Sequence, residues 1–527
     1  MDHLTSTTSA SSGATVWLAA AALLLTTAAL TALQRQRKTR SSSSSNAGAA
    51  AVAAAPPVLR GAALVRFARA VARDGPLEAM REQQDKLGSV FTASLLGLLK
   101  VTFLVGPEVS SHFYLAPDSE ISQGNLYEFT VPIFGPDVAY AVDLHTRNEQ
   151  TRFYWDVLKP RSMKANVAAM AEEVENYFWR WGDEGTVDLK QELEQVLMLI
   201  AGRCLLGREV RERMLGEVFD LYRDLDNGTR LISTLLPYLP TPAHRRRDRA
   251  HRRLRDIFTE AVRSRRNSGR DGSTDDDVLQ RFIDSRYKID GRPMTDAEIV
   301  GLLIALVFAG KHTSAGTSTW IGAHLLSDSN QKHLAAAVDE QDQLTAAARR
   351  DDGAGQHRPR GGVDHDAIQQ MTALHRCIKE VLRLHPPVVA MVRQARSDFT
   401  VQTREGEKYT IPAGHTVMST ILVNHHLPHI YRDPHAFDPQ RFAPGREEDK
   451  AAGPFSFLSF SAGRHACAGE SFAYTQIKVI WSHLLRNFEL KMVSPFPGTN
   501  WSAVVPEPKG KVIVSYRRRA NNTGAGQ

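Results

Sequence analysis

A glycine-rich loop around one cysteine, followed by a helical pattern, sets the narrowest limits on how this chain folds. The loop reads Phe460-Ser461-Ala462-Gly463-Arg464-His465-Ala466-Cys467-Ala468-Gly469, and the helical pattern covers about residues 471–488. Glycines allow tight turns that bring backbone N–H groups towards the sulfur. The N-terminal end of the following helix favours a thiolate over a thiol. Such a thiolate can hold haem iron and push electron density towards bound oxygen, so Cys467 is predicted to be the axial iron ligand.

The other cysteines carry no such pattern. The chain has three cysteines in 527 residues, which does not make a disulfide framework and fits a reducing compartment. Cys204 and Cys377 are therefore expected to be small buried hydrophobic residues. The formal net charge of +7 permits acidic partners or a membrane surface but does not select a fold.

The N-terminus predicts a membrane anchor. Residues 16–33 form a stretch of 18 uncharged, mostly apolar residues, and Arg35, Arg37, Lys38 and Arg40 follow it. This length just spans a bilayer, and the basic flank predicts that the remainder lies in the cytosol. A cleaved secretory signal is the competing interpretation, but a signal carries its positive charge before the apolar run.

The chain divides into four segments. We expect an anchor with its basic flank at 1–40, a Ser/Ala/Pro linker at 41–57, one catalytic domain at 58–518 and a disordered tail at 519–527. Within the domain, strands are predicted at 89–93 and 101–105, and helices at 165–181, 188–206 and 298–326. The fold class is therefore mainly α with a small sheet.

Two irregular segments have ordinary explanations. Residues 244–255 contain seven arginines and could bind nucleic acid, but such a run is more often a helix surface that faces solvent or a membrane. We therefore expect no nucleic-acid partner. Residues 341–366 are polar and rich in Gly, Arg and Asp, which predicts a mobile surface loop.

A second chemical pattern precedes the cysteine loop. Glu380 and Arg383 lie three residues apart on one helix face, just before Pro386 and Pro387 end the helix. Alone, such an ion pair is worth little. Arg441 supplies a third member, and a buried Glu-Arg-Arg network would brace the loop that carries the ligand.

A third pattern is the long helix that a capping box opens at residues 295–298. Its apolar half, 299–309, runs into the polar segment Gly310-Lys311-His312-Thr313-Ser314. Thr313 could donate to the carbonyl four residues back, and Gly310 leaves room for a ligand. A lone threonine in a helix is normally structural, but beside His312 and the cysteine loop we predict that it handles oxygen and protons.

In order and spacing, these three patterns resemble the cytochrome P450 superfamily, from about residue 58 to the end of the chain. The resemblance implies a helical prism with a small β lobe. The segments 127–140 and 310–314 resemble the sterol 14α-demethylase family more narrowly, including His312 before the threonine and His465 in the cysteine loop. The closing stretch 477–518 looks most like the plant branch, the obtusifoliol 14α-demethylases.

The resemblance also implies roles for single residues. Tyr127, Tyr140, Arg393 and His465 would contact the haem propionates, which need charge-assisted donors when buried. Phe460 and Gly463 of the cysteine loop belong to the same cofactor-binding set. The substrate cavity would be lined by Phe129, Phe134 and Ala309. In the family, an aromatic residue at position 129 goes with sterols that bear one methyl group at C4, such as obtusifoliol.

The chain departs from the family pattern at three places. Ala141 replaces an acid, Thr151 stands where many relatives have a haem-contacting lysine, and the segment 341–366 is longer than usual. Some plant relatives with this overall pattern oxidise other triterpenes instead of sterols. The iron-binding residues are unaffected by these departures.

The implied activity is 14α-demethylation of obtusifoliol or a related sterol. It would use haem b, O₂ and electrons from a separate NADPH-dependent cytochrome reductase, at the endoplasmic reticulum membrane with the catalytic domain in the cytosol. One alternative is a plant triterpene hydroxylase or epoxidase. Another is a haem-binding membrane protein without oxidising activity, against which Thr313 argues.

Overall fold

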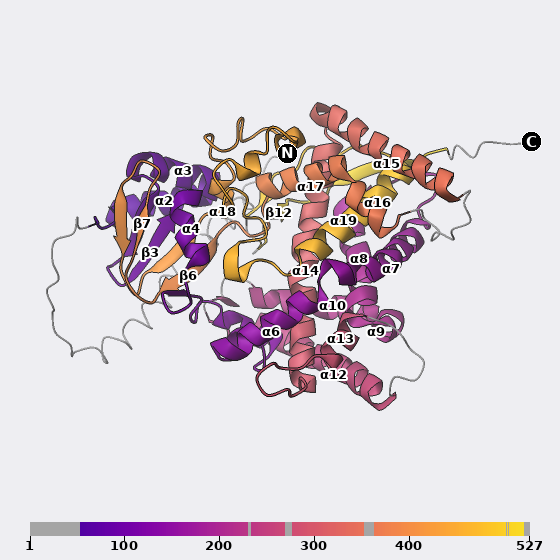
Figure 1. Ribbon diagram of the computed structural model, residues 1–527, viewed down its shortest axis with the longest axis horizontal. Coiled ribbons are helices and arrows are strands. Elements are labelled where there is room, and N and C mark those ends of the chain that lie inside the picture. Colours follow the sequence, from indigo (N-terminus) through magenta and orange to yellow (C-terminus); the bar gives the residue numbers. More distant parts are fainter. Residues whose placement is uncertain are drawn as a thin grey trace, which may run out of the picture.

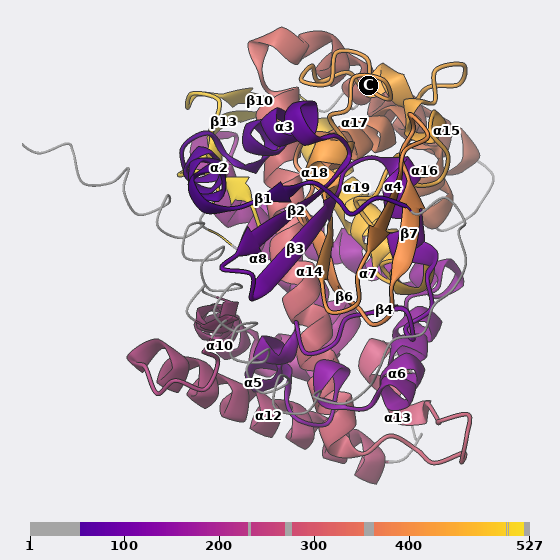
Figure 2. The same ribbon diagram turned by 90° about the vertical axis from the view of Figure 1, so that its left-hand side faces the viewer.

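The computed structural model describes residues 53–229, 233–234, 236–268, 277–352, 363–501, 503 and 505–520. The predicted anchor, most of the linker and nearly all of the predicted tail lie outside these residues. Figure 1 shows β3, β6 and β7 with α2, α3 and α4 on the left and most of the long helices on the right. One helix, α14 (Asp296–Leu325), runs down the middle of the molecule in both views (Figures 1 and 2).

The main sheet has six strands in the order β1-β2-β3-β9-β6-β4. These are Val58–Leu59, Val90–Leu95, Leu99–Leu104, Thr416–Ser419, Met391–Ala395 and Ile121–Ser122. β2 and β3 form an antiparallel hairpin that turns at Gly97, where φ is 74°. The strands predicted at 89–93 and 101–105 are therefore confirmed.

Three smaller sheets complete the β structure. The three-stranded sheet joins β10 (Phe488–Met492), β13 (Ile513–Arg518) and β5 (Glu184–Asp188). Two hairpins pair β7 (Phe399–Gln402) with β8 (Lys408–Ile411), and β11 (Thr499–Asn500) with β12 (Glu507–Pro508).

Helices make up the larger part of the fold, as expected. Before α14 they are α2 (Gly61–Asp74), α3 (Pro76–Leu87), α4 (Pro107–Leu115), α5 (Val131–Phe134), α6 (Leu144–Val157), α7 (Pro160–Phe178), α8 (Leu189–Ala201), α9 (Arg208–Arg213), α10 (Leu215–Leu225), α12 (Pro242–Ser268) and α13 (Val278–Asp284). After it come α15 (Gln331–Asp352), α16 (His365–Gln370), α17 (Thr372–Leu384), α18 (Ile421–Asn424) and α19 (Glu470–Asn487).

The capping box defines the start of α14. Thr295 accepts from the Glu298 backbone N–H through Oγ1 at 3.2 Å, and the Glu298 carboxylate accepts from the Thr295 N–H at 2.8 Å. Among the described residues, α14 is the one helix long and apolar enough to cross a membrane. Its apolar residues are instead largely buried in the main hydrophobic core, so it is the central core helix.

The arginine-rich segment 244–255 lies within α12, which confirms that it is helical. The segment 341–366 differs from its predicted loop, because α15 continues to Asp352 and α16 begins at His365. Gln341 explains the error: it is fully buried and accepts a 2.7 Å hydrogen bond from Ser482 of α19, so a polar residue anchors the helix to the core. Residues 353–362 lie outside the described part of the chain.

Candidate active site

The cysteine loop is held in shape by its backbone. The Cys467 N–H donates to the Phe460 carbonyl at 2.8 Å, and α19 begins three residues after the cysteine. Gly463 has a φ of 64°, and a Cβ there would collide with the Tyr114 carbonyl oxygen of α4. Glycine is therefore required at 463 both for its conformation and for the close approach of α4.

Cys467 differs from the other two cysteines in its surroundings. Cys204 and Cys377 are buried, and burial raises the pKa of each thiol to about 12. Cys467 is exposed. The protein around its sulfur is nevertheless dense enough to raise the pKa of the thiol, against the backbone N–H groups of Gly469 and Glu470, which favour the thiolate.

The protein around Cys467 therefore stabilises the predicted thiolate only in part. The loop and the helix N-terminus do favour it, but burial outweighs them. A coordinated metal ion deprotonates a thiol outright, so the raised pKa does not oppose iron ligation.

The structure brings Glu380, Arg383 and Arg441 together with no solvent exposure. Arg383 donates to both Glu380 oxygens at 2.8 Å, and Arg441 Nε donates to Oε1 at 2.9 Å. Backbone carbonyls accept the remaining Arg383 N–H groups, and Glu448 accepts from Arg441 at 2.5 Å. Every charge in the network is therefore paired, which a buried ionic cluster requires.

This network lies beside the segment that leads into the cysteine loop. Ser459 donates to the Leu382 carbonyl of α17 at 2.9 Å, and the Leu458 N–H donates to His425 at 2.7 Å. The His425 carbonyl in turn accepts from Arg383. The bracing predicted from sequence thus has a continuous path of hydrogen bonds to the residues before the loop.

The four residues expected to hold the propionates gather between α4, the start of α6, β6 and the cysteine loop. The Tyr127 and Tyr140 rings stack with centroids 4.8 Å apart, and the Tyr127 hydroxyl donates to the Val392 carbonyl at 3.1 Å. Arg393 interacts electrostatically with both tyrosines. His465 Nε2 lies 3.6 Å from Asp118, and burial together with Arg393 lowers the pKa of His465, which favours the neutral imidazole.

Arg393 is the strongest sign that an anion belongs here. It is 1% exposed, and one guanidinium nitrogen, Nη1, donates to the Phe113 carbonyl. Its Nε and Nη2 have no hydrogen-bond partner among the described residues. Buried donors of this kind are costly unless they meet an acceptor. The residues present therefore fit the carboxylates of a haem.

The middle of α14 exposes a short polar stretch. Ala309 and Gly310 are exposed although most of the helix is buried, and a Cβ at Gly310 would meet nothing within 4 Å. Thr313 Oγ1 donates to the Ala309 carbonyl at 2.8 Å. One residue further on, Ser314 accepts from Gln476 of α19 at 2.7 Å, which ties this stretch to the helix behind Cys467.

Aromatic residues stand next to the same stretch. Phe134 of α5 packs edge-on against Phe308 with centroids 5.6 Å apart, and Phe129 lies 6.4 Å from the Tyr127 ring. Both Phe129 and Phe134 are half-buried. Phe134 and Phe308 therefore form an apolar surface next to Ala309, whereas Phe129 lies beside the Tyr127 ring.

The departures from the family pattern leave this arrangement intact. Thr151 of α6 donates to the Arg147 carbonyl at 2.9 Å and so remains a local helix contact. Arg147 itself lies 5.4 Å from the centre of the Tyr140 ring. A cation therefore stands near the predicted propionate site one helical turn before Thr151. Ala141 follows Tyr140 in a 3₁₀ turn, Ala139–Ala141.

Asp226, which the sequence did not single out, binds both His312 and its neighbour Lys311. Asp226, in the 3₁₀ turn Asp226–Thr229 after α10, accepts from His312 Nε2 at 2.7 Å and from Lys311 Nζ at 3.2 Å. No sequence pattern connects Asp226 to α14. A lysine inside an otherwise apolar helix was a visible signal for Lys311, because such a residue is seldom buried unless paired.

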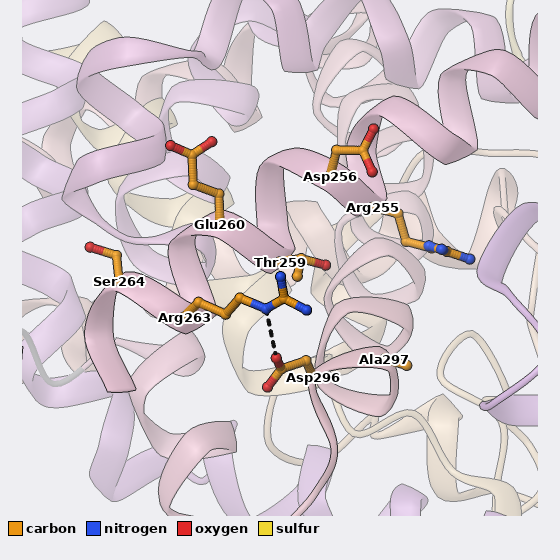
Figure 3. A pocket seen from close by; sticks show the side chains of 8 residues that line it. All are labelled: Arg255, Asp256, Thr259, Glu260, Arg263, Ser264, Asp296 and Ala297. Carbon is orange, nitrogen blue, oxygen red and sulfur yellow. Dashed lines mark hydrogen bonds and ion pairs between the residues drawn. The ribbon is translucent and has the colours of Figure 1, made fainter. Parts of the chain in front are cut away.

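A cleft of about 720 Å³ elsewhere on the molecule is not the active site (Figure 3). It lies between α12 and the start of α14 and is lined mainly by polar and charged side chains, among them Asp256, Glu260 and Arg263. Arg263 pairs with Asp296 across it at 3.3 Å. Asp296 and Thr313 are separated by about 25 Å of helix at 1.5 Å per residue.

Comparison with known proteins agrees with this geometry. Residues 56–514 match the cytochrome P450 family model. The fold superimposes on the retinoic acid-bound cyanobacterial CYP120A1 with a TM-score of 0.72, at 21% identity, over 89% of this chain and 100% of that chain. The chain therefore belongs to the cytochrome P450 family, the haem-dependent monooxygenases that draw electrons from NADPH through a separate reductase.

Within that family, the similar proteins are sterol demethylases. The chain is 51% identical to the sterol 14-demethylase of Arabidopsis thaliana over 87% of this chain and 89% of the relative. It is 51% identical to the obtusifoliol 14-alpha demethylase of Sorghum bicolor, over 86% and 88%. Identity to the human lanosterol 14-alpha demethylase is 36%, over 84% and 83%. The predicted superfamily and its plant branch are both confirmed.

Proposed function

We propose that this protein is a sterol 14α-demethylase whose substrate is obtusifoliol or a related 14α-methyl sterol. The observation that carries the proposal is the 51% identity to two plant sterol and obtusifoliol demethylases over at least 86% of the chain. The half-buried Phe134 supports it, because it packs against Phe308, which precedes Ala309 in α14, and a sterol needs a rigid apolar wall.

The reaction removes one methyl group in three rounds, each of which uses one O₂ and two electrons. The 14α-methyl carbon becomes an alcohol and then an aldehyde, and it leaves as formate with a double bond formed in the ring. Haem iron bound by Cys467 supplies the oxidising chemistry, because a thiolate ligand favours O–O cleavage. Tyr127, Tyr140, Arg393 and His465 hold the cofactor through its carboxylates.

Two side chains of α14 manage protons. O–O cleavage consumes protons, and a general acid in hydrogen-bond reach contributes typically about 10²–10⁴-fold to a rate. The Thr313 hydroxyl is oriented by its bond to the Ala309 carbonyl, and His312 is oriented by Asp226. In this account His312 supplies the proton and Thr313 passes it on.

The protein acts at a membrane in this proposal. Residues 16–33 anchor it to the endoplasmic reticulum, residues 58–518 form the cytosolic catalytic domain, and an NADPH-dependent cytochrome reductase is its partner. Deleting residues 1–40 tests the anchor. We expect haem binding to persist and membrane sedimentation to fall, whereas haem loss would place these residues in the folded domain.

Product analysis tests the substrate. The purified protein is combined with a plant cytochrome reductase and NADPH and offered obtusifoliol or a pentacyclic triterpene in parallel. We expect mass spectrometry to find the 14-demethylated sterol and no oxidised triterpene. Oxidation of the triterpene alone would contradict the proposal and identify a triterpene hydroxylase or epoxidase.

A further inference from the structure

Lys311 shares a carboxylate with His312. The Lys311 side chain is 7% exposed, and its Nζ lies 3.2 Å from Asp226 Oδ2. His312 Nε2 lies 2.7 Å from the other oxygen, Oδ1. One anion therefore receives two adjacent cationic or potentially cationic groups from α14.

Burying this ammonium has a cost that an apolar residue would avoid. Lysine is almost never buried unless paired, because removing its charge from water is expensive. Around Lys311 stand the Phe219 ring of α10, 5.6 Å from Nζ, and the largely buried core face of α14. The burial of the Lys311 side chain is best explained by a function that requires its charge.

We propose that Lys311 is a positioning residue for proton delivery, which holds the Asp226 carboxylate in place while His312 releases and regains its proton. The inference rests on the proposed role of His312 as the proton donor. When the imidazolium gives up its proton, Asp226 loses one of its two cationic partners, and the Lys311 ammonium continues to balance the carboxylate. A proton from solvent then restores the imidazolium, so no net charge accumulates.

Among the described carboxylates near Lys311 and His312, Asp226 is the one that pairs with both. Glu194 of α8 interacts electrostatically with Lys190, Lys311, His312 and Glu507. Burial raises the pKa of Glu194, which weakens it as a competing anion, although Lys190 and Lys311 oppose the rise. Glu507 of β12 is engaged by Lys190 at 2.9 Å.

The test compares Lys311→Gln, Lys311→Arg and Asp226→Asn in the full-length haem-loaded protein with reductase. For each, the rate of sterol-dependent NADPH oxidation and the peroxide released are measured. In Lys311→Gln the rate should fall about twofold and a larger share of the NADPH should appear as peroxide, because the Asp226 carboxylate that orients His312 is less well held. Lys311→Arg keeps the charge and should match the wild type, whereas Asp226→Asn should lose more than Lys311→Gln.

A purely structural role for Lys311 would lower the rate without raising the share of NADPH that appears as peroxide. This result, or a Lys311→Arg variant that behaves like Lys311→Gln, would overturn the inference. A second readout does not depend on turnover. The free energy of unfolding is measured for Lys311→Gln, Asp226→Asn and the double variant, and non-additive losses are expected because the two residues pair directly. Additive losses would contradict the pairing. This unfolding measurement applies even where a single variant shows too little turnover for the activity assay.

Formate release by the wild type separates this inference from the proposed function. Formate release with an unchanged share of peroxide in the variants would reject only the role of Lys311. A larger share of peroxide in the variants, without formate from the wild type, would reject only the demethylation.

Discussion

His312 Nε2 lies 2.7 Å from Oδ1 of Asp226, a residue 86 positions earlier in the chain. This contact joins the turn after α10 to the polar centre of α14, three residues past the exposed Ala309. The imidazole is about one-third exposed, so it can exchange protons with solvent while the carboxylate fixes its orientation. The contact therefore places the solvent-facing end of the proposed proton path at His312.

Replacing Asp226 tests that path. In Asp226→Asn the amide cannot stabilise an imidazolium, so we expect substrate turnover to fall about tenfold, less than the roughly 10²–10⁴-fold that a general acid contributes, because His312 itself remains. More of the consumed NADPH should appear as hydrogen peroxide, because O–O cleavage lacks its proton. The carbon-monoxide difference spectrum should be unchanged. Equal coupling in variant and wild type would show that Asp226 plays no part.

Cys467→Ala should abolish thiolate ligation. The reduced carbon-monoxide complex would lose its long-wavelength absorption band, because neither other cysteine lies in a comparable loop before a helix. Cys204→Ala and Cys377→Ala are matched controls, since both thiols are buried with pKa values of about 12. Retention of the band in Cys467→Ala would refute the ligand assignment.

Glu380→Gln should destabilise the protein strongly. The substitution leaves Arg383 and Arg441 without their shared anion in a site with no solvent exposure, and breaking a buried pair costs about 3–5 kcal/mol. Chemical unfolding and haem retention measure the loss. Glu82→Gln, at the exposed Glu82–Lys86 pair, is the control and should cost about 0.5 kcal/mol or less. Similar losses in both variants would mean that the network does not brace the fold.

Phe129→Leu addresses which sterol fits. If Phe129 crowds the second C4 methyl group, the smaller leucine should raise turnover of a C4-dimethyl sterol relative to obtusifoliol. One methyl group in an apolar cavity is worth about 1–3 kcal/mol, so the ratio should change roughly tenfold or more. Competition between the two sterols in one reaction measures it. An unchanged ratio would remove Phe129 from the substrate wall.

Local patterns were the most predictable part of the fold. The capping box at Thr295 and the helix after Cys467 could be predicted because each depends on residues close in sequence. The network of Glu380 with Arg441 was also predicted, although the two residues are 61 positions apart, as a buried cluster that braces the cysteine loop. The end of α15 was missed because Gln341 was treated as a solvent-exposed polar residue, whereas α19 buries it.

In the candidate site, too, local contacts could be predicted from the sequence, whereas contacts that depend on packing could not. The Thr313 bond to the Ala309 carbonyl is a contact within one helix and was predictable from the residue type. Asp226 was not, because its contact with His312 exists only after α10 packs against the core beside α14. The balance of burial over backbone N–H groups at the Cys467 thiol likewise depends on packing that periodicity does not report.

The most direct test of the central claim uses obtusifoliol carrying carbon-13 in its 14α-methyl group. The full-length protein, reductase and NADPH are incubated with this sterol, and released formate is measured by mass spectrometry together with NADPH consumed. The account predicts labelled formate, one molecule for each demethylated sterol and for every three NADPH used productively. Consumption of the sterol without labelled formate, or no reaction with the sterol while a pentacyclic triterpene is oxidised, would contradict it.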